Sequence, residues 1–434
     1  MRKRKGMGCS SLFLTVMLLI IFTISAFSIV FPNGTLRDSL KSSDAVSQTT
    51  DVSGTSDTTD NTGTTQGIDN NNSGEDFQNL YKQLNKTEKR IYRAALSAIK
   101  DEKLEFTIKD VDYDTYLKAS DRAINALLMD HPEFFWLHNG CSYEGVNATA
   151  TSKGRFTMKL GHWNYWKSGN DQKKYLDRLQ KEVDKVAKLT EGASNDYEKV
   201  KIVHDYIVNN NEYDKENLEE SKKDKHRAEA DYIYSAYGCL VNKKSVCAGY
   251  AKAFKLILNN IGINASDVWG RSIKEDGTQG EAHEWNWVEL DGEYYYFDVT
   301  WDDMDFHSNK DYKDVSLSLD GWYAYFGISD EEMTKDHMND NSQFSFPKSG
   351  SDKYNYFTYS KFCLDEYDEV KIEEVLSKQS ESNPVCIKFS SKSDYEKALS
   401  EMSTGNWNTL FGRSASVHLY RQKDEGNVIL ICFK

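Results

Sequence analysis

The stretch Ser245-Val246-Cys247-Ala248-Gly249-Tyr250-Ala251 opens an apolar segment that predicts a helix. Apolar residues recur from Cys247 to Ile261 at helical spacing, Ser245 is a suitable N-cap, and Gly262 is placed as the C′ residue. Cys247 is therefore expected in the first turn, where free backbone N–H groups and the helix dipole favour a thiolate and could stabilise an oxyanion. A buried structural cysteine is the alternative that the helix alone leaves open.

Alternating polar and apolar residues after this helix predict an antiparallel sheet. The expected strands cover 267–273, 283–290 and 293–300, and Asp291-Gly292 between the last two is a strong signal for a two-residue hairpin turn. The cysteine helix is therefore followed by a strand and a hairpin, an arrangement typical of an α+β fold.

The hairpin turn fixes which side chains share a face of the sheet. If Leu290 faces Glu293, Asp298 lies opposite Trp285, and His283, Trp285 and Asp298 point to one side. His283 and Asp298 are then diagonal neighbours with Cα atoms about 7–8 Å apart, within reach of a hydrogen bond between imidazole and carboxylate. A bulge in either strand would break this register.

A thiol at a helix start, an imidazole and a carboxylate are the groups that acyl transfer requires. His283 would take the proton of Cys247, and Asp298 would orient the ring and stabilise its charged form. Cys247 would attack an amide carbonyl and form a thioester, which then passes to an amine or to water. The sequence therefore predicts Cys247, His283 and Asp298 as a catalytic triad.

Three segments resemble the core of the transglutaminase-like superfamily: the stretch 245–251, the stretch 282–292 (AHEWNWVELDG) and the stretch 296–303 (YFDVTWDD). That superfamily is papain-like in layout, with a Cys–His–Asp triad in this chain order, so the resemblance places these roles on Cys247, His283 and Asp298. It covers about residues 190–345, and the segments 130–136 and 325–337 are similar to bacterial members. Glu284 and Cys239 depart from the pattern without touching the triad.

The pattern as a whole predicts an α+β protein with a papain-like transglutaminase core, in which the cysteine helix packs on an antiparallel sheet that carries the histidine and the aspartate. The expected organisation is a cytoplasmic basic segment (1–10), a transmembrane anchor or signal sequence (11–31), a disordered linker (32–75), a mainly helical region (76–190), the catalytic core (191–345) and a small C-terminal α+β module (346–434).

The N-terminus has the pattern of a membrane anchor or signal sequence. A basic start at 2–5 precedes an apolar run at 12–31, whose 20 residues at about 1.5 Å each can cross a hydrocarbon core of about 30 Å. Basic residues before the run predict an exported remainder, hence a single-pass cell-membrane protein with an extracytoplasmic catalytic part. A cleaved signal peptide and a secreted protein are the alternative.

Composition limits the partners. Lys and Arg total 54 against 68 Asp and Glu, a net charge of −14, which argues against nucleic acid as the main partner. No two of the seven cysteines are spaced as C-x-x-C, so we predict no structural zinc site and no cofactor. The six cysteines beyond the apolar run could pair as disulfides in an oxidising compartment, with a connectivity that the sequence leaves open.

Other polar and aromatic residues give weaker signals. The acidic residues at 302, 303 and 305 could bind calcium, although a solvated loop is favoured because no EF-hand spacing is present. His204 lies on an apolar helix stripe and is expected to be a satisfied core histidine, and His307 and His337 have no partners at metal-ligand spacing. Trp285 shares the triad face and is the candidate substrate-binding residue; for Trp287, Trp301 and Trp322, packing is favoured over a substrate cleft.

Two functions remain open at this point. The first is an extracytoplasmic cysteine acyltransferase, amidase or protease that acts on protein or cell-wall peptides. The second is a non-catalytic surface scaffold or binding protein that retains the fold. The presence of all three triad residue types favours the enzyme.

Overall fold

The structure is a computed structural model that describes residues 77–146, 149, 152–162, 169–223, 231–274, 276–303, 323–339, 342–379, 385–404, 418–421 and 427–432. The predicted anchor and linker, with Asp305, His307 and Trp322, lie outside these residues. Among the helices of the described ranges, none combines the length and apolar character needed to cross a membrane. The described residues all belong to one compact unit, so the boundaries expected near 190 and 345 remain predictions.

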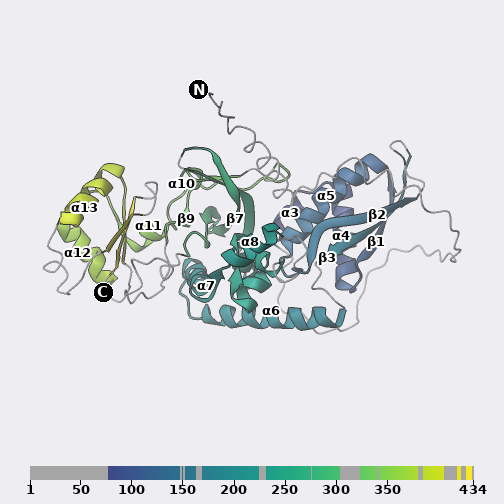
Figure 1. Ribbon diagram of the computed structural model, residues 1–434, viewed down its shortest axis with the longest axis horizontal. Helices are drawn as coiled ribbons and strands as arrows, with labels where there is room; N and C mark the ends of the chain where they lie inside the picture. The colour runs from purple at the N-terminus through teal and green to yellow at the C-terminus, as the bar shows by residue number, and fades with distance from the viewer. Residues whose placement is uncertain are drawn as a thin grey trace, which may run out of the picture. The chain divides into compact units, whose positions relative to one another are not determined.

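The first described region combines helices with a three-stranded antiparallel sheet of order β1-β3-β2 (Figure 1). Its elements are α3 (Asn79–Lys82), α4 (Lys86–Lys100), β1 (Glu105–Val111), α5 (Tyr113–Asp130), β2 (Leu137–Val146) and β3 (Gly154–His162). Asn85 and Glu88 form a capping box that fixes the start of α4. The sequence predicted a mainly helical region here; the apolar run 134–137 forms a buried turn, and only Leu137 enters a strand.

A second group of elements leads to the cysteine helix. It comprises α6 (Gly169–Leu189), α7 (Asp196–Asn210), β4 (Glu212–Tyr213), α8 (Lys215–Lys223), the short helices η3 (Asp231–Tyr234) and η4 (Gly238–Asn242), β5 (Lys244–Ser245) and α9 (Cys247–Asn260). Helix α6 has 21 residues, and α7, which carries the buried His204, has 15. Strand β5 pairs in parallel with β4, immediately before α9 begins.

The ends of α9 agree with the sequence in one place and differ in another. Gly262 has φ +85°, and its N–H donates to Asn259 while that of Ile263 donates to Leu258, which is the Schellman ending that the glycine predicted. The N-cap, in contrast, is Val246 and not Ser245. Ser245 is fully buried in β5, and its hydroxyl accepts a hydrogen bond from Asn211 at 3.0 Å, so its side chain is committed to another segment.

The sheet that follows α9 has five antiparallel strands in the order β10-β6-β7-β8-β9. The strands are β6 (Ala265–Ile273), β7 (Gln279–Leu290), β8 (Glu293–Phe297), β9 (Phe326–Ile328) and β10 (His337–Met338). The predicted hairpin register is confirmed, because Leu290 faces Glu293 across the turn. Strand β8 ends at Phe297, three residues earlier than predicted, so Asp298 follows the strand and is not part of its ladder.

Helix α9 packs on β6 and β7. Asn286 of β7 donates a side-chain hydrogen bond to the carbonyl of Ala251 at 2.9 Å, and the ring of Phe254 lies 5.7 Å from that of Phe297. All four residues are buried. The arrangement confirms the predicted α+β class, with the cysteine helix on an antiparallel sheet.

The C-terminal part contains a four-stranded sheet of order β11-β12-β14-β13. Its elements are α10 (Asp330–Met333), α11 (Tyr356–Ser360), β11 (Cys363–Leu364), α12 (Glu369–Lys378), β12 (Val385–Phe389), α13 (Lys392–Thr404), β13 (His418–Arg421) and β14 (Val428–Cys432). The part expected as a small α+β module thus contains both helices and strands, with β13 and β14 as an antiparallel pair.

Candidate active site

Cys247 is the first residue of α9 and is half-buried, with a free thiol. The N-cap Val246 is extended and makes no side-chain capping bond. The first N–H groups of a helix have no partner within the helix, and here no side chain of the N-cap takes one. The thiol therefore lies beside backbone donors and the positive end of a helix of 14 residues, as the sequence predicted.

His283 and Asp298 meet at the end of the β7–β8 hairpin. Nε2 of the His283 ring lies 2.5 Å from Oδ2 of Asp298, and both side chains are buried. The other carboxylate oxygen, Oδ1, accepts from the backbone N–H groups of Thr300 and Trp301 at 3.0 and 3.1 Å. The predicted contact between histidine and aspartate thus exists, but a turn after β8 and not the strand ladder aims the carboxylate.

The charges of this pair support each other. Burial opposes ionisation of Asp298, but the charge and hydrogen bond of His283, with those of His337, hold its pKa below the ordinary value of 3.8. Burial also disfavours a charged His283, yet Asp298 and the thiol of Cys247 raise its pKa well above 6.5. The Cys247 thiol acts on this pKa because it lies close to the His283 ring, so the structure brings all three predicted residues near one another.

His337 is a fourth member of this group that sequence reasoning missed. Its Nε2 lies 3.0 Å from the same Asp298 oxygen, and its Nδ1 lies 2.6 Å from Asp336, whose second oxygen accepts from the Tyr325 hydroxyl at 2.5 Å. His337 comes from the edge strand β10, 39 residues after Asp298. The residue spacing around His337 does not indicate its contact with Asp298, although the segment 325–337 resembles bacterial members of the superfamily.

Tryptophan rings surround the imidazoles. Trp301 is half-buried, and its ring centre lies 5.1 Å from that of His283 and 4.2 Å from that of His337. Trp285, the predicted substrate-binding residue, is only 2% exposed and belongs to a buried apolar cluster with Val268. Its contacts are with the core and with the two histidine rings, because β7 turns this face inward.

His283, Asp298 and His337 also form a group that could hold a metal ion, with their donor atoms within 4.8 Å of one another. The prediction that His337 lacks such partners is therefore wrong. Two ligands of a tetrahedral zinc at about 2.0–2.1 Å stand about 3.3 Å apart. The 2.5 Å between His283 and Asp298 is shorter. This geometry fits a shared proton better than a shared ion.

Asp302 and Asp303, the two described acidic residues after the hairpin, are held by protein groups and do not lie in a solvated loop. Asp302 is fully buried and accepts from Nε2 of His204 at 3.1 Å and from the backbone of Tyr325 at 2.9 Å, and burial raises its pKa to about 7. Asp303 accepts a hydrogen bond from the hydroxyl of Tyr250. His204 is a satisfied core histidine, as predicted, with Asp205 on its other nitrogen at 3.0 Å.

The cysteines at positions 141, 239, 247, 363 and 386 are free thiols. Cys239 is buried, and that burial raises the pKa of its thiol to about 12. Cys247 differs in position, because it lies at a helix start and close to the His283 ring.

Comparison with solved structures found remote likenesses, with which this chain aligns over part of its length. A structure described as a TGase shares 14% identity over 55% of this chain and 60% of its own, with a TM-score of 0.27. A candidate protease from Parabacteroides distasonis shares 14% identity over 36% of each chain, with a TM-score of 0.21. A candidate cysteine protease from Cytophaga hutchinsonii shares 18% identity over 37% of this chain and 62% of its own, with a TM-score of 0.20.

These solved structures are longer than the part that this chain covers, which is less than two thirds of each. A search of the curated proteins found no match. Residues 183–299, which contain Cys247, His283 and Asp298, match the family model described as the transglutaminase-like superfamily, so the resemblance seen in the sequence is confirmed for this segment.

Proposed function

We propose that Cys247, His283 and Asp298 form the catalytic triad of a cysteine-dependent acyltransferase or hydrolase that acts on amide groups of proteins or peptides. The observation that carries this proposal is the buried contact of 2.5 Å between the His283 ring and the Asp298 carboxylate, with the Cys247 thiol close enough to raise the pKa of that ring. The match of this segment to the transglutaminase-like superfamily supports the same chemistry.

Each residue has one role in the proposed reaction. His283 uses Nδ1, the ring nitrogen not bonded to Asp298, to take the thiol proton of Cys247. The sulfur attacks the amide carbonyl, the free N–H groups at the start of α9 stabilise the oxyanion, and His283 returns the proton to the leaving amine. The resulting thioester passes its acyl group to a second amine or to water.

Asp298 keeps the imidazole in the orientation and tautomer that this sequence of steps requires. Two backbone N–H groups hold its Oδ1, so Oδ2 remains directed at His283. Trp301 covers the ring and excludes water from it. The proposed location, extracytoplasmic and either anchored through residues 11–31 or secreted, follows from the sequence pattern of the N-terminus.

Mass spectrometry of the reaction products tests the proposal. The full chain is incubated with candidate protein and cell-wall peptide substrates, with and without a small primary amine, beside Cys247→Ala. An amine adduct that depends on Cys247 indicates transfer, and a free acid indicates hydrolysis. Cys363→Ala is the matched control, since Cys363 is also a half-buried free thiol but lies in β11.

Thiol labelling separates an inactive scaffold from an enzyme whose substrate was not supplied. In the proposed enzyme, iodoacetamide modifies Cys247 faster than Cys363, and the advantage disappears in His283→Gln. Equal labelling rates of Cys247 and Cys363 in the wild-type chain, together with unchanged products from Cys247→Ala, would contradict the proposal and favour the non-catalytic surface protein.

A further inference from the structure

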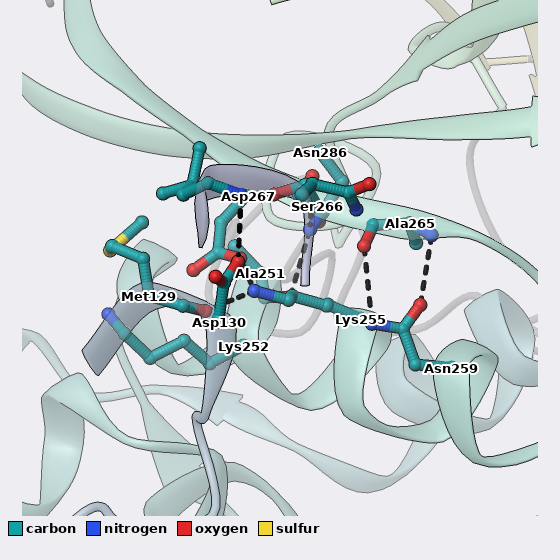
Figure 2. Close-up of polar contacts among 12 residues, drawn as sticks. Met129, Asp130, Ala251, Lys252, Lys255, Asn259, Ala265, Ser266, Asp267 and Asn286 are labelled. Atoms are coloured by element: carbon teal, nitrogen blue, oxygen red, sulfur yellow. Dashed lines mark hydrogen bonds and ion pairs between the residues drawn. The ribbon is translucent and has the colours of Figure 1, made fainter. Parts of the chain in front are cut away.

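Lys255 has its ammonium group in the protein interior. It lies on α9, its side chain is 1% exposed, and its Nζ is 2.8 Å from Oδ1 of Asp267, which is 0% exposed. Figure 2 shows the lysine extended between Asp267 and the backbone of Met129, whose carbonyl accepts a hydrogen bond from Nζ. Removing two charges from water costs several kcal/mol per ion, which only good geometry and further hydrogen bonds offset.

Asp267 lacks those further bonds. No N–H or hydroxyl group of the described residues donates to either of its carboxylate oxygens, and Lys255 meets it as an ion pair. The other polar neighbour is Glu284, which can donate to Asp267 only when it is protonated. Asp130, a second buried carboxylate near this lysine, differs: it accepts from the N–H groups of Leu80 and Tyr81 and from the Tyr92 hydroxyl. The buried Lys255–Asp267 pair is therefore poorly compensated on the aspartate side.

A third ionisable group lies on the same face of the sheet. Asp267 faces Asn286 across the β6–β7 ladder, which makes Glu284 its diagonal neighbour on that face. Glu284 is 4% exposed, and both its oxygens contact Nζ of Lys252, at 3.0 and 3.2 Å. Burial raises the pKa of Glu284 to about 7. Asp267 also raises this pKa, whereas Lys252 lowers it. A carboxyl group with this pKa can both take up and release a proton near neutral pH.

We propose that Lys255 and Asp267 condense into an intramolecular amide bond, with Glu284 as the group that carries the proton. The inference goes beyond the proposed function, because it involves none of the triad residues and requires no external substrate. It assigns a covalent modification site that ties the cysteine helix α9 to strand β6.

The condensation balances without an oxidant, a reductant or a co-reactant. Lys255 first passes a proton to Asp267, which gives a neutral amine and a neutral acid side by side. The amine lone pair attacks Cγ of Asp267 and forms the C–N bond. Glu284 takes a proton from the attacking nitrogen and returns one to the departing hydroxyl, the C–O bond breaks, and one water leaves.

The site supplies the two conditions that this condensation needs. The first is proximity: Nζ of Lys255 lies 2.8 Å from Oδ1, an oxygen bonded to the Cγ that it would attack. The second is exclusion of water. In aqueous solution the equilibrium favours the ionised acid and amine over the amide, and a dry site removes that preference. Lys255 and Asp267 are both fully buried.

The test is the mass of the wild-type full chain. With all thiols alkylated, the intact mass is expected to be lower by one water. Trypsin leaves the Lys255 site uncleaved, and fragmentation identifies a branched peptide that joins Lys255 to Asp267. A full intact mass with the two residues in separate linear peptides overturns the proposal, as does a branch that joins Lys252 to Glu284. Loss of water without a branch, as in an aspartate succinimide opened by hydroxylamine, overturns it too.

Variants separate this bond from acyl chemistry at Cys247. Cys247→Ala is expected to keep the branched peptide, and its loss in that variant would contradict an autocatalytic bond. Asp267→Asn is expected to lose ammonia in place of water, since the same attack then expels the amide nitrogen. Glu284→Gln, of nearly equal size, should lower the cross-linked fraction at least tenfold at early times after synthesis; an unchanged fraction would remove Glu284 from the mechanism.

Discussion

Nε2 of His337 lies 3.0 Å from Oδ2 of Asp298, the same oxygen that accepts from His283 at 2.5 Å. One carboxylate oxygen thus serves two buried imidazoles that come from different strands. A carboxylate held by several donors is fixed in direction and in charge. This arrangement makes His337 a positioning residue for the proposed triad.

Replacing His337 tests that role. His337→Leu removes one donor from Asp298, so the carboxylate holds the His283 ring less firmly, and we expect kcat to fall about 10- to 100-fold with little change in KM. His337→Gln, whose amide can donate to the same oxygen, should restore part of the loss. The two variants are compared for kcat, KM and the acid limb of the pH–rate profile. The midpoint of that limb should move to higher pH in His337→Leu. Equal losses in both variants, with no shift of that limb, would point to a purely structural role.

Asp298→Asn tests the charge of the carboxylate itself. The amide has the same shape but cannot stabilise a charged imidazole, and we expect kcat/KM to fall by about 100- to 10,000-fold. The matched control is Asp291→Asn, because Asp291 belongs to the same hairpin but is exposed in its turn and bonded only to surface groups. Activity in Asp298→Asn within a factor of two of wild type would exclude a triad role for Asp298.

The His283–Asp298 pair should give stability a defined pH window. The lowered pKa of Asp298 means that its contribution is present above its ordinary value of 3.8 and is lost as pH falls below it. The raised pKa of His283 means that its contribution is complete below 6.5 and is lost as pH rises through the folded value. A tenfold difference in proton affinity between the folded and unfolded chain corresponds to about 1.4 kcal/mol of stability.

Urea unfolding followed by tryptophan fluorescence measures this window. The difference in unfolding free energy between wild type and the double variant His283→Gln, Asp298→Asn should be largest between about pH 4 and 6.5 and shrink on both sides. A difference that is flat across pH 3 to 9 would show that the pair is not ionised in the folded protein.

Gly270 controls how closely β10, and with it His337, approaches the sheet. A Cβ at this position would lie 2.0 Å from the carbonyl oxygen of Met338 in β10. Gly270→Ala must therefore move backbone, and we expect it to destabilise the fold by about 1–3 kcal/mol and to lower turnover beyond the loss of folded protein. Gly192→Ala, where a Cβ meets nothing within 4 Å, is the control. Crystal structures or histidine NMR signals of the two variants would show whether His337 has moved.

The local sequence pattern by itself determines much of the core. Periodicity and the glycine at 262 locate α9 to within a residue, because helix ends depend on short-range backbone geometry. The Asp291-Gly292 turn sets the hairpin register, because both residues adopt the positive φ that a two-residue turn requires. That register brings His283 close to the end of β8, where Asp298 follows the strand.

Tertiary structure decided what local pattern could not. Ser245 is a good N-cap in isolation, but Asn211, 34 residues away, holds its hydroxyl. Asp298 was predicted in a strand, but it lies at the start of a turn. Its backbone N–H donates to the carbonyl of Tyr325, and its side chain accepts hydrogen bonds from the backbone N–H groups of the residues that follow it. His337 and Asp302 acquired their partners from segments 39 and 98 residues away. Periodicity reports which face of an element is buried, whereas the partner of a buried polar group is set by which elements pack together, and that is a property of the folded chain alone.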